Sequence, residues 1–223
     1  MKSKFKNKIA MYIKNYTYPG PILRTILRFR YGILLPICVM FINGCASRFP
    51  ELQRLAPFPD EQICHVAVLP FVNESNYAQA DLIVYKIFMA ELLKSTHFHV
   101  AQEGDIRKVY RQLRIYPQHP PNIEQLRIIA DRINAQIFVA GTIQEAQEKT
   151  SGQAPNPQLT FTLQIVDAAS GRTLWSTYHT REGIQYQKVM HFGLVTNISG
   201  LARRMSQEIL NLWSREGLQP CTE

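Results

Sequence analysis

The sequence predicts a single domain of the α/β class (α+β mixed), in which helices flank one mixed β-sheet. Short β-branched runs alternate with helical patterns in its first half, which indicates parallel strands joined by right-handed crossovers. Two runs with a period of two, on either side of a glycine turn, indicate an antiparallel hairpin in its second half. An amphipathic helix follows. The expected order is β-α-β-α-α-β-β-β-α over residues 63–215.

The first half supplies the alternating elements. The apolar run 63–71 ends in proline and predicts a buried strand, and the next residues form a polar loop. Apolar side chains at helical spacing predict the helix that follows. Asn122, with Gln125 three residues later, predicts a capping box at the start of the third helix. We expect helices at 78–95, 103–113 and 122–133, and strands at 98–100 and 136–145.

The second half predicts the hairpin and the last helix. Residues 146–156 are polar, contain Gly and Pro, and indicate an exposed connection. Phe161, Leu163 and Ile165 alternate with polar residues, so the strand 158–167 is half-buried. Gly171 supplies the turn to the partner strand 172–180. The last helix is expected over 194–214, with a short tail at 216–223.

The basic charge is concentrated before the domain. Of the 25 basic residues, eight lie in residues 1–44, which contain no Asp or Glu. The remaining 17 basic residues balance 17 acidic ones, although the whole chain has a net charge of +8. A domain without excess positive charge lacks the electrostatic signature of nucleic-acid binding. We therefore expect no nucleic-acid partner.

The amino-terminal segment is typical of a secretory signal peptide. A basic stretch precedes the apolar run 31–42, which is too short to span a bilayer. The run ends in Ile42-Asn43-Gly44-Cys45, which resembles the bacterial lipobox. The resemblance implies cleavage between Gly44 and Cys45, acylation of Cys45 and a membrane anchor formed by the lipid. The alternative is an uncleaved signal anchor with Cys45 a bystander.

The mature protein would begin with a lipid and a tether. Ala46 follows Cys45, and the absence of Asp there favours the periplasmic face of the outer membrane. Residues 45–62 contain three prolines and predict an extended tether. Cys64 and Cys221 remain in the domain, where an oxidising periplasm permits a disulfide between them. The alternative is two unpaired thiols.

Three stretches carry a family resemblance. They are VAVLPFVNES, IADRINAQIFVAGTIQE and LQIVDAASGRTLWS. Together they resemble the amino-terminal domain of TolB and the lipoprotein domains of the curli-secretion, penicillin-binding-protein-activator and flagellar outer-membrane families. Ala135-Gln136 stands where those families have an Ala-Asp junction. The resemblance covers about residues 63–215 and implies a domain that binds proteins or assists assembly.

No motif predicts catalysis. The sequence contains no HExxH, GxSxG, GxGxxG or Walker pattern, so we expect no enzyme and no cofactor. His97 and His99 are two residues apart, but no Cys or acidic pair completes a metal site. The polar loop at the carboxyl end of the first strand is a candidate partner-binding loop, consisting of Asn73, Glu74, Ser75, Asn76 and Tyr77.

The sequence therefore predicts an outer-membrane lipoprotein that binds other envelope proteins and has no catalytic role. Three alternatives remain open. The domain could bind a small ligand through its strand-end loops, it could be an unrecognised enzyme, or it could be a subunit of a ring-forming secretion assembly. A homo-oligomer is compatible with each. A concave site with convergent polar groups favours ligand binding, and an exposed apolar patch or open sheet favours protein binding.

Overall fold

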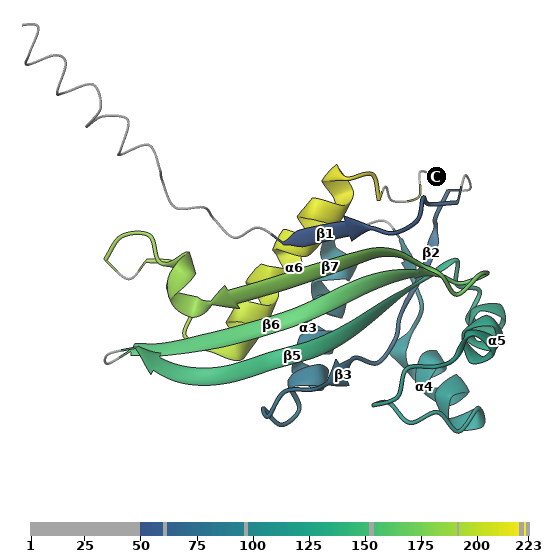
Figure 1. Cartoon of the computed structure of the whole chain (residues 1–223), viewed down its shortest axis with the longest axis horizontal. Coiled ribbons are helices and arrows are strands. Elements are labelled where there is room, and N and C mark those ends of the chain that lie inside the picture. Colours follow the sequence, from purple (N-terminus) through teal and green to yellow (C-terminus); the bar gives the residue numbers. More distant parts are fainter. Residues whose placement is uncertain are drawn as a thin grey trace, which may run out of the picture. The chain divides into compact units, whose positions relative to one another are not determined.

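A computed structural model of the chain describes residues 50–59, 62–95, 98–151, 154–190, 192–218 and 221. It confirms the mixed α/β class, with a seven-stranded sheet in the order β1-β7-β6-β5-β2-β4 and β3 beside β5 (Figure 1). The elements are β1 (Glu51–Arg54), β2 (His65–Val68), β3 (Val72–Asn73), α3 (Ala80–Ser95), β4 (His99–Val100), α4 (Glu103–Gln112), α5 (Ile123–Ile133), β5 (Ile137–Ser151), β6 (Ala154–Asp167), β7 (Thr173–Glu182), the 3₁₀ turn η2 (Gly183–Tyr186) and α6 (Ile198–Arg215).

The sheet divides where the sequence changes its pattern. β2 pairs in parallel with β4 and β5, whereas β5, β6 and β7 form an antiparallel meander. α3 and α6 cover one face of the sheet, where the larger apolar core lies. α4 and α5 cover the other face only beside β2 and the start of β5. The antiparallel part therefore keeps one face uncovered.

Two of the resembling motifs meet inside the domain. Phe71, at the end of the first motif, packs directly on Gly141 of the second. A Cβ at residue 141 would lie 2.6 Å from the Phe71 ring, so the ring needs glycine beneath it. Phe71 also contacts Tyr85 and Phe88 of α3, with ring centroids 5.5 and 5.9 Å away. This aromatic contact fixes α3 against the centre of the sheet.

The unusual Ala135-Gln136 junction has a clear structural role. The Gln136 side-chain oxygen accepts hydrogen bonds from the backbone N–H groups of Cys64 and His65, at 2.6 and 2.9 Å. The Gln136 amide donates to the carbonyl of Gln62 at 3.1 Å. Buried backbone groups at a strand end need such partners. A glutamine at this junction therefore ties the start of β2 to the start of β5.

The structure differs from the expected tether at Glu51–Arg54. These residues form β1, which pairs antiparallel with β7 along the sheet edge. Beyond β1, the Leu55 amide donates to the Leu174 carbonyl at 2.8 Å, and the Phe58 ring meets the Trp175 ring edge-on at 4.6 Å. A four-residue edge strand with three exposed side chains has no alternating pattern that could reveal it.

The expected polar connection at 146–156 is also different. β5 and β6 continue as a paired hairpin arm beyond the covering helices (Figure 1). Side-chain hydrogen bonds link its strands, from Lys149 to Gln158 at 2.7 Å and from Gln158 to Glu145 at 2.9 Å. Side chains from Gln147 to Thr150 are exposed, so no buried face imposes an apolar period there.

The expected tail is partly built into the domain. Leu218 is buried in the larger core, and its amide donates to the Trp213 carbonyl at 2.9 Å. Cys221 is joined to Cys64 by a disulfide, with Cα atoms 4.9 Å apart. The chain end is thereby fixed to the residue that precedes β2.

Candidate protein-binding face

The uncovered side of the antiparallel strands is the largest continuous feature that could meet a partner. Two rows of side chains cross it. One row runs through Thr142, Thr162, Tyr178 and Glu51, and the other through Ala140, Gln164, Ser176 and Gln53. In Figure 1 this side of β5, β6 and β7 faces the viewer, with α3 and α6 behind it. We call these eight residues the open face.

The chemistry of the open face is that of hydroxyl and amide groups. Tyr178 is 40% exposed and is its only aromatic residue. Gln144 donates to the Thr162 hydroxyl at 2.7 Å, which holds the centre of the face in place. Glu51, at one end of its row, is its only charged residue. The interior of a protein interface is typically depleted in charge, and tyrosine is enriched there.

An apolar hollow borders the open face beside α5. It has a volume of about 560 Å³ and is lined by residues of the prolyl segment before α5, by Leu126 and by Ala140 and Gln164 of the face. Ile123 at its rim is 53% exposed. Gly171, at φ +70°, lies so close to Ile123 that a Cβ there would meet its side chain at 3.2 Å. The hairpin turn and α5 therefore shape this hollow together.

A polar cluster behind β7 supports the face from the helical side. The Glu208 carboxylate on α6 lies 2.6 Å from Nε2 of His179 and accepts a hydrogen bond from Arg181 Nε at 3.1 Å. Burial alone would raise the pKa of Glu208, but its contacts with His179 and Arg181 hold that pKa below its ordinary value. Trp213 on α6 donates to the Thr177 hydroxyl at 2.7 Å. These contacts attach α6 to β7.

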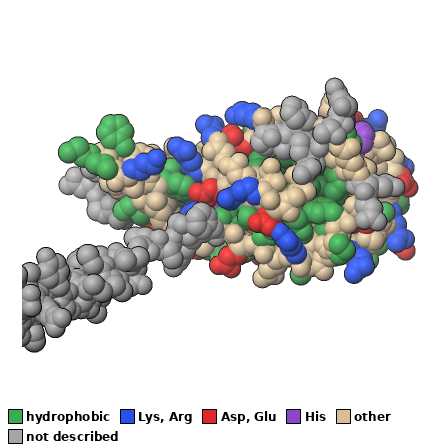
Figure 2. All heavy atoms as spheres, turned by 90° about the horizontal axis from the view of Figure 1, so that it is seen from above, with side chains coloured by type: hydrophobic (Ala, Val, Ile, Leu, Met, Phe, Trp, Pro, Cys, Tyr) green, Lys and Arg blue, Asp and Glu red, His purple; other side chains and the backbone are tan. Residues whose placement is uncertain are grey.

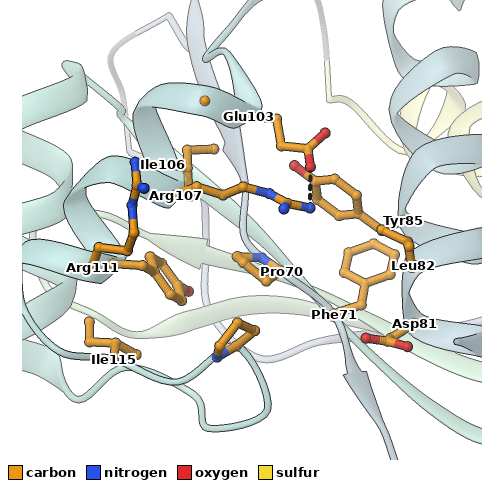
Figure 3. A pocket seen from close by; sticks show the side chains of 13 residues that line it. Pro70, Phe71, Asp81, Leu82, Tyr85, Glu103, Ile106, Arg107, Arg111 and Ile115 are labelled. Carbon is orange, nitrogen blue, oxygen red and sulfur yellow. Dashed lines mark ion pairs between the residues drawn. The ribbon is translucent and has the colours of Figure 1, made fainter.

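A separate cavity lies at the carboxyl end of β2, between α3 and α4 (Figure 3). Its volume is about 420 Å³, and Pro70 and Phe71 lie on its floor. Glu103 and Arg107 of α4 pair at 2.5 Å on its wall. Burial, followed by the Glu103 carboxylate, raises the pKa of Tyr85 to about 12 despite the opposing effect of Arg107. The Tyr85 phenol therefore stays protonated at neutral pH.

The sequence-predicted loop is held together largely by its own polar groups. The Asn73 side chain donates to the Tyr77 carbonyl at 2.9 Å and accepts from the backbone and hydroxyl of Ser75 at 3.0 and 2.7 Å. Tyr77 packs against the larger core. Only Glu74 and Asn76 of the five residues are exposed. The role of this loop in partner binding stays a prediction.

The other predicted residues lie apart from the open face. Gly44, Cys45, His97 and His191 fall outside the described residues. His99 of β4 stacks on His65 of β2, with ring centroids 5.1 Å apart, on the parallel side of the sheet. Among the described residues no group of three His, Cys, Asp or Glu side chains could hold a metal ion. No described helix is long and apolar enough to cross a membrane.

A comparison with protein families decides the identity of the domain. The family described as peptidoglycan-synthase activator LpoB matches residues 47–180, which is more than half of the chain. The chain belongs to this family. Of the families that its motifs resemble, the penicillin-binding-protein activators are thereby supported, while the resemblances to TolB and the curli-secretion family stay predictions.

Solved structures also resemble this LpoB-family chain. The PelC dodecamer from Paraburkholderia phytofirmans is 18% identical, with 72% of this chain and 95% of that one covered and a TM-score of 0.48. Lipoprotein GNA1162 from Neisseria meningitidis is 15% identical, with 68% and 99% covered and a TM-score of 0.49. The LpoB C-terminal domain from Salmonella enterica is 17% identical, with 53% and 82% covered and a TM-score of 0.40. No curated protein sequence matches the chain.

The LpoB-family match includes all eight residues of the open face. It begins at residue 47, just before β1, and ends at Thr180 near the end of β7, before η2 and α6. Sequence reasoning missed this face because it depends on the register of four strands, one of which lies far earlier in the chain. The only available signal was the alternation of polar residues in 158–167, which indicates a solvent-facing side but no partner.

Proposed function

We propose that this protein is a lipoprotein of the outer membrane that activates a peptidoglycan synthase by binding it on the periplasmic side, and that it catalyses no reaction itself. The observation that carries the proposal is the LpoB-family match over residues 47–180. The match starts two residues after Cys45, so a lipid on that residue would leave the matched region intact. The charge balance of the chain after residue 44 also suits a protein partner better than a nucleic acid.

The lipid anchor is tested at Cys45. We expect the wild-type product to begin at Cys45 and to carry fatty acyl groups, because Ile42, Gly44 and Cys45 match the lipobox. Cys45→Ser should leave the amino-terminal segment attached and the chain without a lipid. Intact-mass spectrometry of the purified membrane fraction measures both. A wild-type product that retains residues 1–44, or has a free Cys45 thiol, contradicts the anchor.

The open face is the proposed contact with the synthase. Its central side chains are uncharged, it is about four strands wide, and an apolar hollow adjoins it. Interfaces combine such a charge-depleted interior with pockets that receive apolar anchors. The cavity between α3 and α4 has ionised groups on its walls, which would have to be desolvated when a protein covers them.

A charge placed on the open face should abolish activation. Thr162→Arg puts a long cation at its centre, and we expect binding to the synthase to weaken at least tenfold, because an unpaired charge in an interface must be desolvated. Tyr178→Arg tests the same face at a more exposed position. The measurements are binding to the peptidoglycan synthases of the same bacterium and their rate of glycan polymerisation, with circular dichroism as a check of folding.

Two control variants give this test its discrimination. Arg204→Ala changes an exposed residue of α6, on the opposite side of the sheet, and should leave binding unchanged. Gly104→Leu adds bulk to the wall of the cavity, at a position where a Cβ would meet no atom within 4 Å. Activation that survives Thr162→Arg and Tyr178→Arg but is lost with Gly104→Leu would move the contact to the cavity.

A second function, binding of a small periplasmic molecule, is favoured by that cavity alone. It is concave, lies at the carboxyl end of parallel strands and brings Asp81, Tyr85, Glu103 and Arg107 together around an apolar floor. Gly104→Leu separates the two functions. A small ligand that raises the melting temperature of the wild type but not of Gly104→Leu would support this function.

A further inference from the structure

The loop that follows η2 exposes three large apolar side chains within four residues. Val189, Met190 and Phe192 are 68%, 84% and 77% exposed. Figure 2 shows hydrophobic side chains gathered at this end of the molecule, with basic side chains beside them. Isolated exposed hydrophobic residues are ordinary, but a cluster on one loop marks a surface that meets another apolar phase. We call residues 188–192 the apolar loop.

The apolar loop is closed by its own backbone. The Lys188 amide donates to the Phe192 carbonyl at 2.8 Å, and the Phe192 amide donates to the Val189 carbonyl at 2.9 Å. Gly193 follows at φ +83°, where a Cβ would lie 2.5 Å from the Tyr186 carbonyl oxygen. These contacts keep the loop compact, with its apolar side chains outside the core.

The strand register places the apolar loop on the side from which the chain enters the domain. β1 and β7 are antiparallel, with Glu51 opposite Tyr178. Moving backward along β1 toward Cys45 is therefore the same direction as moving forward along β7 to η2 and the apolar loop (Figure 1). Cys45 and Pro50 are five residues apart, a distance that a fully extended chain spans with at most about 18 Å.

The charges near the apolar loop favour a lipid surface. No acidic residue occurs between Glu182 and Glu208, whereas Lys188, Arg203 and Arg204 are basic. A lysine beside an apolar tip can extend its stem over the acyl region and keep its ammonium among the phosphates. A protein groove would not require the loop to lie on the side of the lipidated residue.

We propose that the apolar loop is a second membrane contact, with Val189, Met190 and Phe192 inserted into the interface of the bilayer that holds the lipid of Cys45. The proposal rests on the anchor argued under the proposed function. The lipid sets the distance between domain and membrane, and the apolar loop sets the orientation. The open face, on β5 to β7, is then held at a fixed angle to the bilayer.

Indole fluorescence of the full lipoprotein tests the insertion. The two native tryptophans, Trp175 and Trp213, are buried, so they contribute a constant background. Phe192→Trp places an indole at the tip, and the lipoprotein is reconstituted into vesicles of phosphatidylethanolamine and phosphatidylglycerol. We expect brominated acyl chains to quench the added emission at least threefold. Tyr116→Trp, on the exposed loop between α4 and α5, is the matched control and should not be quenched.

Further arms separate the outcomes. Met190→Glu in the Phe192→Trp background should abolish the quenching, since a carboxylate resists insertion. Absence of quenching in Phe192→Trp itself overturns the proposal, as does a blue shift that needs the synthase and occurs without lipid. If mass spectrometry shows that Cys45 carries no lipid, the anchor fails by itself. The soluble product is then titrated with the same vesicles, and a blue shift of the Phe192→Trp indole still supports the apolar loop.

Discussion

Replacing Glu208 with alanine is expected to lower the free energy of unfolding by about 3 kcal/mol. The Glu208 carboxylate is the shared partner of His179, which is 1% exposed, and of the buried Arg181. Its removal leaves the Arg181 guanidinium buried without a counter-charge, which is the costly way to break a buried ion pair. Denaturant unfolding followed by circular dichroism measures the change. Glu216→Ala, which breaks a surface pair with Arg54, is the control and should change stability by about 0.5 kcal/mol or less.

The same carboxylate predicts a pH dependence. The pKa of Glu208 is lower in the folded protein than its ordinary value of 4.5. A carboxyl group of this kind stabilises the fold at pH values above 4.5, and its contribution is lost as the pH falls through the folded-state pKa. The wild type should therefore lose part of its stability below pH 4.5, and the Glu208→Ala variant should lose less over that range. Equal losses in both proteins would contradict the assignment.

Loss of the disulfide is expected to have the other large effect on stability. Cys64 and Cys221 are 157 residues apart, so the cross-link closes almost the whole domain into one loop. For so long a loop the chain-entropy relation gives about 5 kcal/mol, and removals of native disulfides cost about 2–5 kcal/mol. We expect dithiothreitol to lower the urea midpoint of the oxidised protein, and the double variant Cys64→Ala/Cys221→Ala to unfold at a similarly reduced midpoint.

The double variant is also the control for the reductant. It has no cross-link in the domain, so dithiothreitol should not shift its midpoint. A wild-type midpoint that is unchanged by the reductant, with free thiols absent before and present after treatment, would show that the bridge forms but does not stabilise the domain. Two free thiols in the untreated protein would show that the bridge does not form.

The sequence predicted the elements that have a one-sided apolar environment. The capping box formed by Asn122 and Gln125 is present and starts α5 one residue after Asn122. Phe161, Leu163 and Ile165 lie on the side of β6 that packs on α3 and α6, and the chain turns at Gly171 as predicted. In each case the local pattern and the packing require the same conformation, which makes a single sequence informative.

Other features could not be predicted because they depend on pairing between distant parts of the chain. β1 is a strand only because the β7 edge is free to pair with it. The contact of Glu208 with His179 and Arg181 requires both the tilt of α6 and the register of β7, and its three residues show no common motif. The extended hairpin arm is solvated, so its sequence reads as a loop.

The docking of β1 has a mechanical consequence. Any pull transmitted through the acyl chains would first load the four residue pairs between β1 and β7. If β1 detached, the thirteen residues between Pro50 and Ile63 would release up to about 45 Å of slack without opening the core. The release would stop at Cys64, where the disulfide ties the strand entry to the end of the chain. The edge strand therefore stores a length of chain that tension can draw out, with a covalent stop at its end.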